Sequence, residues 1–250
     1  MLKNTQKIIA FLILFVTAYA CKVTKDTVVS RNFHAITTKY NVLFNGKEAF
    51  KKGIEDINNN YKDDWFKRLP IEPIVFEENK IVLSSYNNNR PGAGFGANED
   101  EEKKELTTFE KAEEKAVKAI QTHGMNINGI ERNRQIDDAY LLLGKSRYYT
   151  QRFIPSIEAF NYVIANYPQA DLIAETKIWR AKANTRNDNE EIAIEAMKLL
   201  LVVRDSLEAN LPDIIKEQAH TALAMAYVKT DSLQNAKKHL QLATRTLKNR

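Results

Sequence analysis

The chain has 250 residues, of which 44% are hydrophobic, so it is long enough to fold into one or two packed domains and is not a disordered tail. Only eight glycines and six prolines interrupt it, and this composition favours helices. The formal net charge is +5, but basic and acidic residues alternate throughout instead of forming a basic face, so we predict no nucleic-acid partner.

Residues 1–20 have the profile of a bacterial signal peptide. Two lysines precede an apolar run from Ile8 to Val16, and the small residues Ala18 and Ala20 follow it. The run is shorter than the roughly 20 residues that span a bilayer, which disfavours a permanent transmembrane helix. We expect this segment to be removed from the mature protein.

Cys21 is the only cysteine and stands where lipoprotein processing cleaves. The sequence Thr-Ala-Tyr-Ala-Cys resembles a bacterial lipobox, although Ala18 replaces the usual Leu and Tyr19 is bulky. Acyl chains on a cysteine anchor a protein because each buried methylene contributes about 0.8 kcal/mol. We predict lipidation of Cys21, with residues 21–32 as a tether; the alternative is a secreted protein in which this thiol is incidental. No acidic surface-export cluster follows, which favours a position facing the periplasm.

The first predicted structural unit is a helical hairpin over residues 33–60. Its pattern indicates two helices broken at Asn45-Gly46. The residues expected to point inward are Ile36, Tyr40, Ala49 and Ile54. We interpret the hairpin as a degenerate first repeat.

A long loop or linker is predicted over residues 61–106, because it contains three prolines, a glycine-rich stretch at 91–97 and an acidic run at 99–102. Loops of this length in compact domains are usually functional or disordered. Residues 69–76 carry enough apolar side chains to dock, either on the solenoid itself or on a partner. The glycine-rich part is predicted to be a flexible linker.

Residues 107–250 are predicted to form tetratricopeptide-like helical repeats. A capping box at Thr107-x-x-Glu110 opens this region. Three units follow, and their small positions recur 37 and 43 residues apart (144 to 181 and 181 to 224). Turns are predicted at 187–189 and 230–232. The predicted repeat-packing residues are Tyr140, Leu143, Gly144, Phe160, Pro168, Ala181, Ala193, Ala224, Tyr227 and Ala236.

The predicted fold class is therefore all-α, a tetratricopeptide-like α-solenoid of antiparallel helix pairs with a long irregular insertion. A non-repetitive helical bundle shares the same 3.6-residue periodicity and is the alternative. In such solenoids the first helix of each pair lines a concave groove. The predicted groove residues are Asp138, Lys145, Tyr148, Tyr149, Lys182, Arg186, Met225 and Lys229. Their cations would form a basic stripe suited to an acidic or C-terminal peptide; alternatively they form a solvated face.

The sequence shows no pattern of catalytic or metal-binding residues. The glycines at 92, 94 and 96 lack the Lys-Ser/Thr that a nucleotide loop needs, and the four histidines lack metal-ligand spacing. The carboxylates lie mostly in Glu/Lys-rich helical stretches, where they face water. We predict no enzymatic activity, no metal, no cofactor and no small-molecule substrate.

Several segments resemble a known family. These are residues 30–46 (SRNFHAITTKYNVLFNG), Leu69-Pro-Ile71, residues 109–116 (FEKAEEKA) and residues 136–144 (IDDAYLLLG). They are similar to the PorW/SprE lipoproteins of the Bacteroidetes, and the likeness covers the chain from Cys21 to about Pro168. It implies a lipid-anchored outer-membrane protein that faces the periplasm and takes part in type IX protein secretion and gliding motility.

The same resemblance implies partners. They are subunits of an envelope secretion complex, with the repeats linking a periplasmic ring to the outer-membrane translocon. Because members of that family are usually much longer, a fragment of a longer protein stays open. Other classes also stay open: a scaffold of another envelope assembly such as outer-membrane β-barrel assembly, a SusD-like glycan-binding lipoprotein and an enzyme of peptidoglycan turnover.

Overall fold

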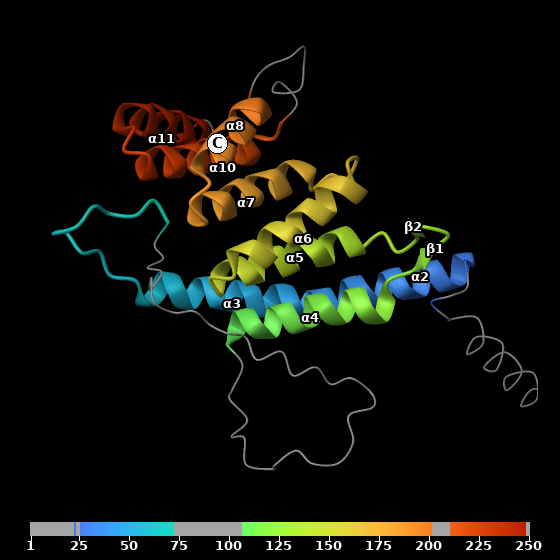
Figure 1. Ribbon diagram of the computed structural model, residues 1–250. Coiled ribbons are helices and arrows are strands. Elements are labelled where there is room, and N and C mark those ends of the chain that lie inside the picture. Colours follow the sequence, from blue (N-terminus) through green and yellow to red (C-terminus); the bar gives the residue numbers. More distant parts are fainter. Residues whose placement is uncertain (1–22, 24–25, 73–106, 202–210, 249–250) are drawn as a thin grey trace, which may run out of the picture.

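Helix pairs stack in chain order into an all-α solenoid, which confirms the predicted fold class (Figure 1). The computed structural model describes residues 23, 26–72, 107–201 and 211–248. The helices are α2 (Val28–Thr37), the π-helix η1 (Thr38–Leu43), α3 (Phe44–Asn60), α4 (Thr108–His123), α5 (Ile136–Tyr149), α6 (Phe153–Asn166), α7 (Ile173–Arg186), α8 (Glu190–Leu201), α10 (Asp213–Lys229) and α11 (Leu233–Lys248).

The hairpin predicted over residues 33–60 is wrong: α2, η1 and α3 follow one another without a turn as a single helix from 28 to 60. Gly46 suggested a turn, but its role is close packing. A Cβ at Gly46 would lie 2.9 Å from Leu142 Cδ2 and 3.0 Å from Lys115 Cβ. Glycine therefore allows the long helix to approach α4 and α5, and α4 is its antiparallel partner.

The predicted inward face of the long helix is wrong in its first half; in the second half Ala49 packs against the core and Ile54 is half-buried. Ile36 and Tyr40 are 58% and 67% exposed, whereas Ser30, His34 and Thr38 are buried. Outward-facing apolar residues follow the helix as a stripe, which we call the apolar stripe: Val29, Phe33, Ile36, Tyr40 and Phe44.

Helix α4 begins at the predicted capping box. The Thr107 hydroxyl accepts the Glu110 N–H at 3.2 Å, and the Glu110 carboxylate accepts the Thr107 N–H at 2.8 Å. The buried residues Ala112 and Ala116 let the helix lie close to both α3 and α5. The predicted capping box is confirmed.

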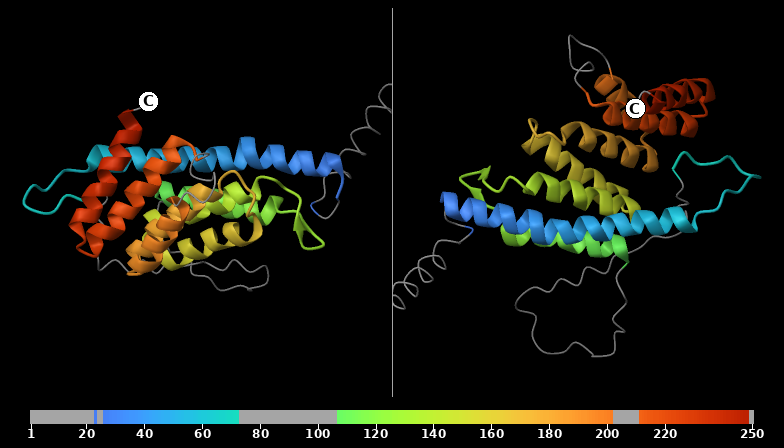
Figure 2. Two further views of the ribbon diagram at one scale, coloured as in Figure 1. Left: turned by 90° about the horizontal axis from the view of Figure 1, so that it is seen from above. Right: turned by 180° about the vertical axis from the view of Figure 1, so that it is seen from behind.

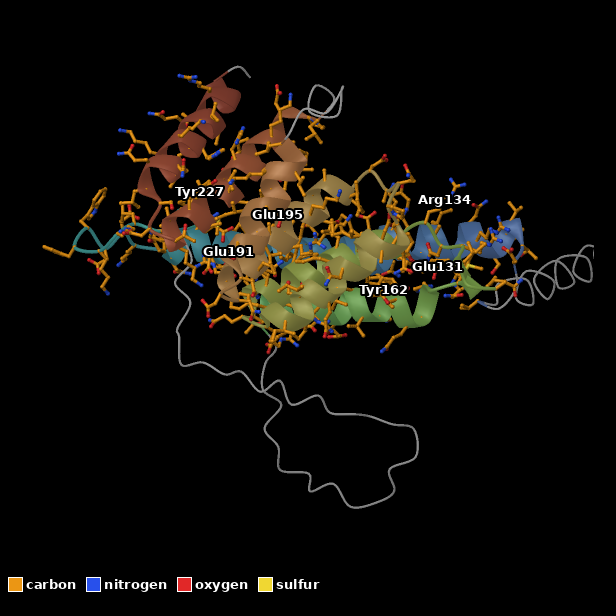
Figure 3. The ribbon with its side chains drawn as sticks, turned by 45° about the horizontal axis from the view of Figure 1, so that its top comes forward. Glu131, Arg134, Tyr162, Glu191, Glu195 and Tyr227 are labelled. Carbon is orange, nitrogen blue, oxygen red and sulfur yellow. The ribbon has the colours of Figure 1, made fainter. Side chains whose placement is uncertain are left out.

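A two-stranded hairpin that was not predicted connects α4 to α5, with β1 (Asn126–Ile127) antiparallel to β2 (Ile130–Glu131). Its turn residues Asn128 and Gly129 have φ of 54° and 79°, the left-handed values that Asn-Gly turns adopt. The Glu131 carboxylate, labelled in Figure 3, accepts the N–H groups of Met125 at 2.7 Å and Asn133 at 2.8 Å. This side chain therefore holds the hairpin on the end of α4.

The three repeats share one turn geometry. Gln151, Asp188 and Asp231 all have positive φ, of 61°, 57° and 56°. Each lies seven residues after the small residue of its unit (144, 181 and 224), and the next residue's N–H bonds back to the carbonyl five positions earlier at 2.8–2.9 Å. The turns predicted at 187–189 and 230–232 are confirmed, and this geometry supports the repeat frame.

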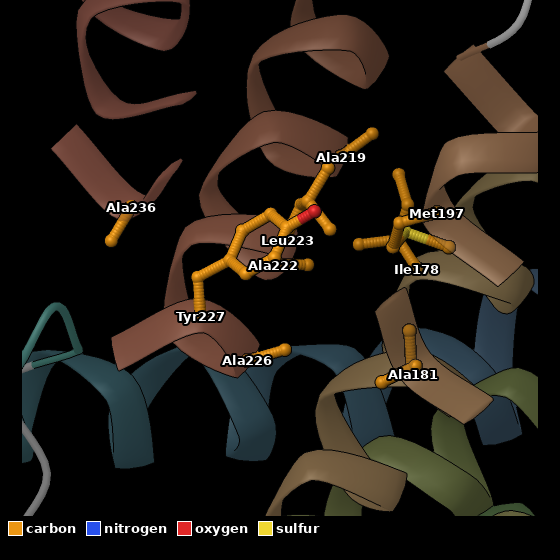
Figure 4. Packing of buried hydrophobic residues seen from close by; sticks show 10 residues of the cluster. Ile178, Ala181, Met197, Ala219, Ala222, Leu223, Ala226, Tyr227 and Ala236 are labelled. Atoms are coloured by element: carbon orange, nitrogen blue, oxygen red, sulfur yellow. The ribbon is translucent and has the colours of Figure 1, made fainter. Parts of the chain in front are cut away.

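Small residues set the spacing between helices within the repeats. A Cβ at Gly144 would overlap the Phe160 ring. The other repeat-packing residues that the structure buries are Leu143, Phe160, Ala181, Ala193, Ala224, Tyr227 and Ala236. Figure 4 shows the cluster in which Ala181 of α7, Met197 of α8 and Leu223 of α10 meet.

The other two predicted packing residues differ in outcome. Tyr140 is half-buried but does pack within its repeat, where it contacts the core cluster and stacks on Tyr162 of α6 with ring centroids 4.0 Å apart. Pro168 is exposed and follows the end of α6, so it stops the helix and does not pack between repeats.

Candidate functional site

Helices α5, α7 and α10 are the first helices of the three repeats, and α7 contacts both others. Residues 61–72, which we call the arm, leave the end of α3 on the same side of the solenoid as the C-terminal ends of these helices (Figures 1 and 2). Arg68 of the arm contacts the α10–α11 turn, where its guanidinium lies 3.2 Å from Asp231. The arm thus crosses from α3 to the repeats.

The arm ends in a pocket that takes up the Glu72 carboxylate. Its walls are Tyr148 of α5 with Trp179, Lys182 and Arg186 of α7, and we call these four residues the carboxylate pocket. The Tyr148 hydroxyl donates to Glu72 Oε2 at 2.6 Å, and Arg186 Nη2 lies 3.4 Å from the same oxygen. The Lys182 ammonium pairs with Oε1. The Glu72 side chain is only 11% exposed.

Helical spacing brings the α7 residues of the pocket together, because positions 179, 182 and 186 lie on one face. The Lys182 ammonium lies 3.9 Å from the centroid of the Trp179 ring and 5.4 Å from that of Tyr148. Two aromatic faces thus hold the lysine beside the Glu72 carboxylate. Tyr148 itself is fully buried at the end of α5.

The charges of the pocket favour an ionised Glu72. Burial by itself raises the pKa of the Glu72 carboxyl, but attraction to Lys182 and hydrogen bonds from Lys182 and Tyr148 outweigh it, so the pKa lies below its usual value. Burial, together with the Glu72 charge, raises the pKa of Tyr148 well above normal, so its hydroxyl remains a donor. Burial lowers the pKa of Lys182, which therefore depends on an anionic partner.

Two further predicted groove residues lie next to the pocket. Lys145 pairs with Glu175 and lies 5.3 Å from the Trp179 centroid, so its charge is already matched. Tyr149 stacks on Phe109 with centroids 4.7 Å apart, and it belongs to the aromatic packing between α4 and α5.

The other three predicted groove residues are elsewhere. Asp138 bonds to Lys47 of the long helix at 2.8 Å, and Met225 is buried. Lys229 pairs with Asp188 and with Glu190, the latter at 3.1 Å. The prediction of a continuous basic stripe is therefore wrong. Acidic neighbours on the solenoid neutralise Lys145 and Lys229 at its two ends, and Lys182 and Arg186 face Glu72.

Sequence reasoning missed two central residues, Glu72 and Trp179. The apolar run at 69–76 did indicate that this segment docks on the solenoid or on a partner, and the structure shows the first alternative for Glu72. Trp179 lies three residues before Lys182, a spacing that by itself predicts a cation over its ring.

Charged and polar groups also gather outside the pocket. Glu113 of α4 pairs with Arg147 of α5 at 3.0 Å and with Arg152. Two histidine pairs, His34 with His123 and His220 with His239, each bring their Nδ1 atoms within 3.0 Å. Within the described ranges, no three His, Cys, Asp or Glu side chains gather where they could hold a metal ion.

Several predictions fall outside the described residues. These are the signal peptide at 1–20, lipidation of Cys21 and the glycine-rich half of the insertion. Of the predicted tether at 21–32, only residues 21, 22, 24 and 25 lie outside, and its end is wrong, because residues 28–32 belong to helix α2. Among the helices that are described, none is long and apolar enough to cross a membrane. Comparison of the sequence with protein-family models and with curated proteins found no match.

Proposed function

We propose that this chain is a membrane-tethered scaffold that binds other proteins and carries no catalytic site. One observation supports the proposal above the others: the first helices of adjacent repeats together form a pocket that already binds a non-helical segment of the chain through a carboxylate. Solenoids of stacked helix pairs offer such continuous faces for protein partners.

The cellular setting that we propose follows from the resemblance to PorW/SprE lipoproteins. In it, Cys21 anchors the chain to the outer membrane facing the periplasm, and the solenoid links the periplasmic ring of the type IX secretion machinery to the translocon. Three segments that carry the resemblance supply residues to one core, among them Val42, Ala112 and Leu142. This supports treating the segments as one structural unit.

The experiment is an affinity pull-down from detergent-solubilised envelopes with the native gene product, followed by mass spectrometry. Recovery of ring or translocon subunits is the expected result. Recovery of β-barrel-assembly or glycan-uptake proteins in their place would overturn the assigned system and leave the scaffold. A Cys21→Ala preparation from the same strain is the control for capture that depends on the membrane.

A further inference from the structure

We propose that the carboxylate pocket is the binding site for an acidic, non-helical segment of a partner protein, and that Glu72 occupies it as an intramolecular competitor. The inference rests on the proposed scaffold function and adds the chemistry of the ligand and the means by which the site is kept closed.

The pocket requires an anion at all times. Lys182 and Arg186 face one carboxylate, and their side chains are 14% and 25% exposed. A cation left in such a site without a partner is strongly destabilising. The arm and a partner's carboxylate are thus alternatives, and neither state leaves Lys182 unpaired.

Exchange between these alternatives has a small net cost. Both states bury one carboxylate against the same ammonium, guanidinium and phenol, so the free-energy cost of removing the carboxylate from water is the same in both. The net free energy of exchange is then the difference between the other contacts that the arm and the partner segment make. Elsewhere on the arm, the ion pair between Arg68 and Asp231 has side chains 57% and 80% exposed, and such pairs contribute little.

The surrounding chain defines the kind of segment that fits. Glu72 lies in a stretch without helix or strand, in which residues 71 and 72 form a bend, and Pro70 and Pro73 flank it in the sequence. Proline on both sides disfavours a helix around Glu72. All three polar groups that meet the carboxylate are donors, and an amide would turn its own NH₂ toward one of them. The ligand is therefore a carboxylate on a non-helical segment.

The test uses the full chain and a fluorescent peptide with the sequence of residues 66–76, followed by fluorescence anisotropy. Because a tethered competitor has an effective concentration on the order of millimolar, wild type should bind the peptide weakly. Glu72→Gln should bind it at least tenfold more tightly. A peptide with Gln at the Glu position should not bind. A third peptide ends at that Gln with a free C-terminal carboxylate. Binding of this peptide would show that the pocket accepts a C-terminal carboxylate as well as a side-chain carboxylate.

Two variants locate the binding. Lys182→Met in the Glu72→Gln background should abolish binding, whereas Lys177→Met, which removes a lysine of α7 outside the pocket, should not change it. Equal affinity of wild type and Glu72→Gln, or binding without Lys182, would place the peptide elsewhere and overturn the proposal. No binding to folded Glu72→Gln would make Glu72 a fixed part of the fold.

Wild type itself provides a second test if Glu72→Gln does not fold. Peptide at saturating concentration should accelerate amide hydrogen exchange in residues 61–72, because the arm leaves the pocket. Unchanged exchange would overturn the competitor role. If the peptide fails but the pull-down recovers envelope partners, the scaffold proposal stands and only this pocket assignment falls.

Discussion

The Lys182 ammonium lies 3.9 Å from the centroid of the Trp179 ring, one helical turn away on α7, and pairs with Glu72 across the same pocket. The fluorescence of the Trp179 indole should therefore report whether the arm is docked in the pocket. Because the chain has two tryptophans, replacing Trp65 with Phe leaves Trp179 as the only one.

Acid should release the arm. The docked pKa of Glu72 lies below its ordinary 4.5, so docking is at full strength above pH 4.5 and is lost as pH falls through the lowered value. In the Trp65→Phe background we expect Trp179 emission to shift to the red below pH 4.5, while circular dichroism reports helix content. Glu72→Gln should show the shifted spectrum at pH 7. An unchanged acid transition in that variant would contradict the assignment.

Glu113 should be a major contributor to stability. Its side chain is 8% exposed between Arg147 and Arg152, whereas that of its neighbour Glu114 is 54% exposed. Glu113→Gln should lower the free energy of unfolding by about 3 kcal/mol, because two partly buried guanidinium groups lose their counter-charge. The matched control Glu114→Gln should change it by less than about 0.5 kcal/mol. Urea denaturation measures both, and equal effects would contradict the buried pairing.

Gly144 should not tolerate a methyl group. A Cβ there overlaps the Phe160 ring, so Gly144→Ala should destabilise the protein by about 2 kcal/mol. Adding Phe160→Leu should restore part of this loss if the clash is the cause. Glu158→Ala, at an exposed position of α6, is the control and should stay within about 0.5 kcal/mol of wild type. Thermal unfolding of the four proteins decides the matter.

The protein should lose stability as pH falls below about 6.5, the ordinary pKa of histidine. Burial lowers the pKa of His123, with smaller contributions from His34 and Lys118, and burial also lowers the pKa values of His220 and His239. The unfolded chain then binds more protons below about pH 6.5, so stability falls with pH. His123→Gln should reduce the pH dependence of the unfolding free energy. An equal pH dependence of the unfolding free energy in His123→Gln and wild type would exclude His123 as a cause.

Lipidation predicts a clear change of location. Cys21→Ala should move the protein from the membrane fraction to the soluble fraction, because the acyl chains have no other attachment site. Circular dichroism of the purified variant should match wild type, since residue 21 precedes α2, the first of the described helices, by several residues. A variant that stays in the membrane fraction after a salt wash would rule out the anchor.

The sequence alone determined the repeats. Small residues, turn residues and large apolar residues recur at fixed local spacings, and the turns at Asp188 and Asp231 follow from contacts within a few residues. The capping box of α4 is also local. Such features can be predicted because a short stretch of chain contains both partners of each interaction.

Only the tertiary structure decided which surfaces meet. Asn45-Gly46 is a sequence typical of turns, yet Gly46 lies inside a helix, where its missing side chain leaves room for Leu142. Ile36 fits the spacing of inward-facing residues, yet no described segment covers it. The pocket joins Glu72 to Lys182 across 110 positions (182 − 72). Local periodicity gives the faces of a helix, but it does not state which face a distant segment covers, and charge complementarity decided that for the arm.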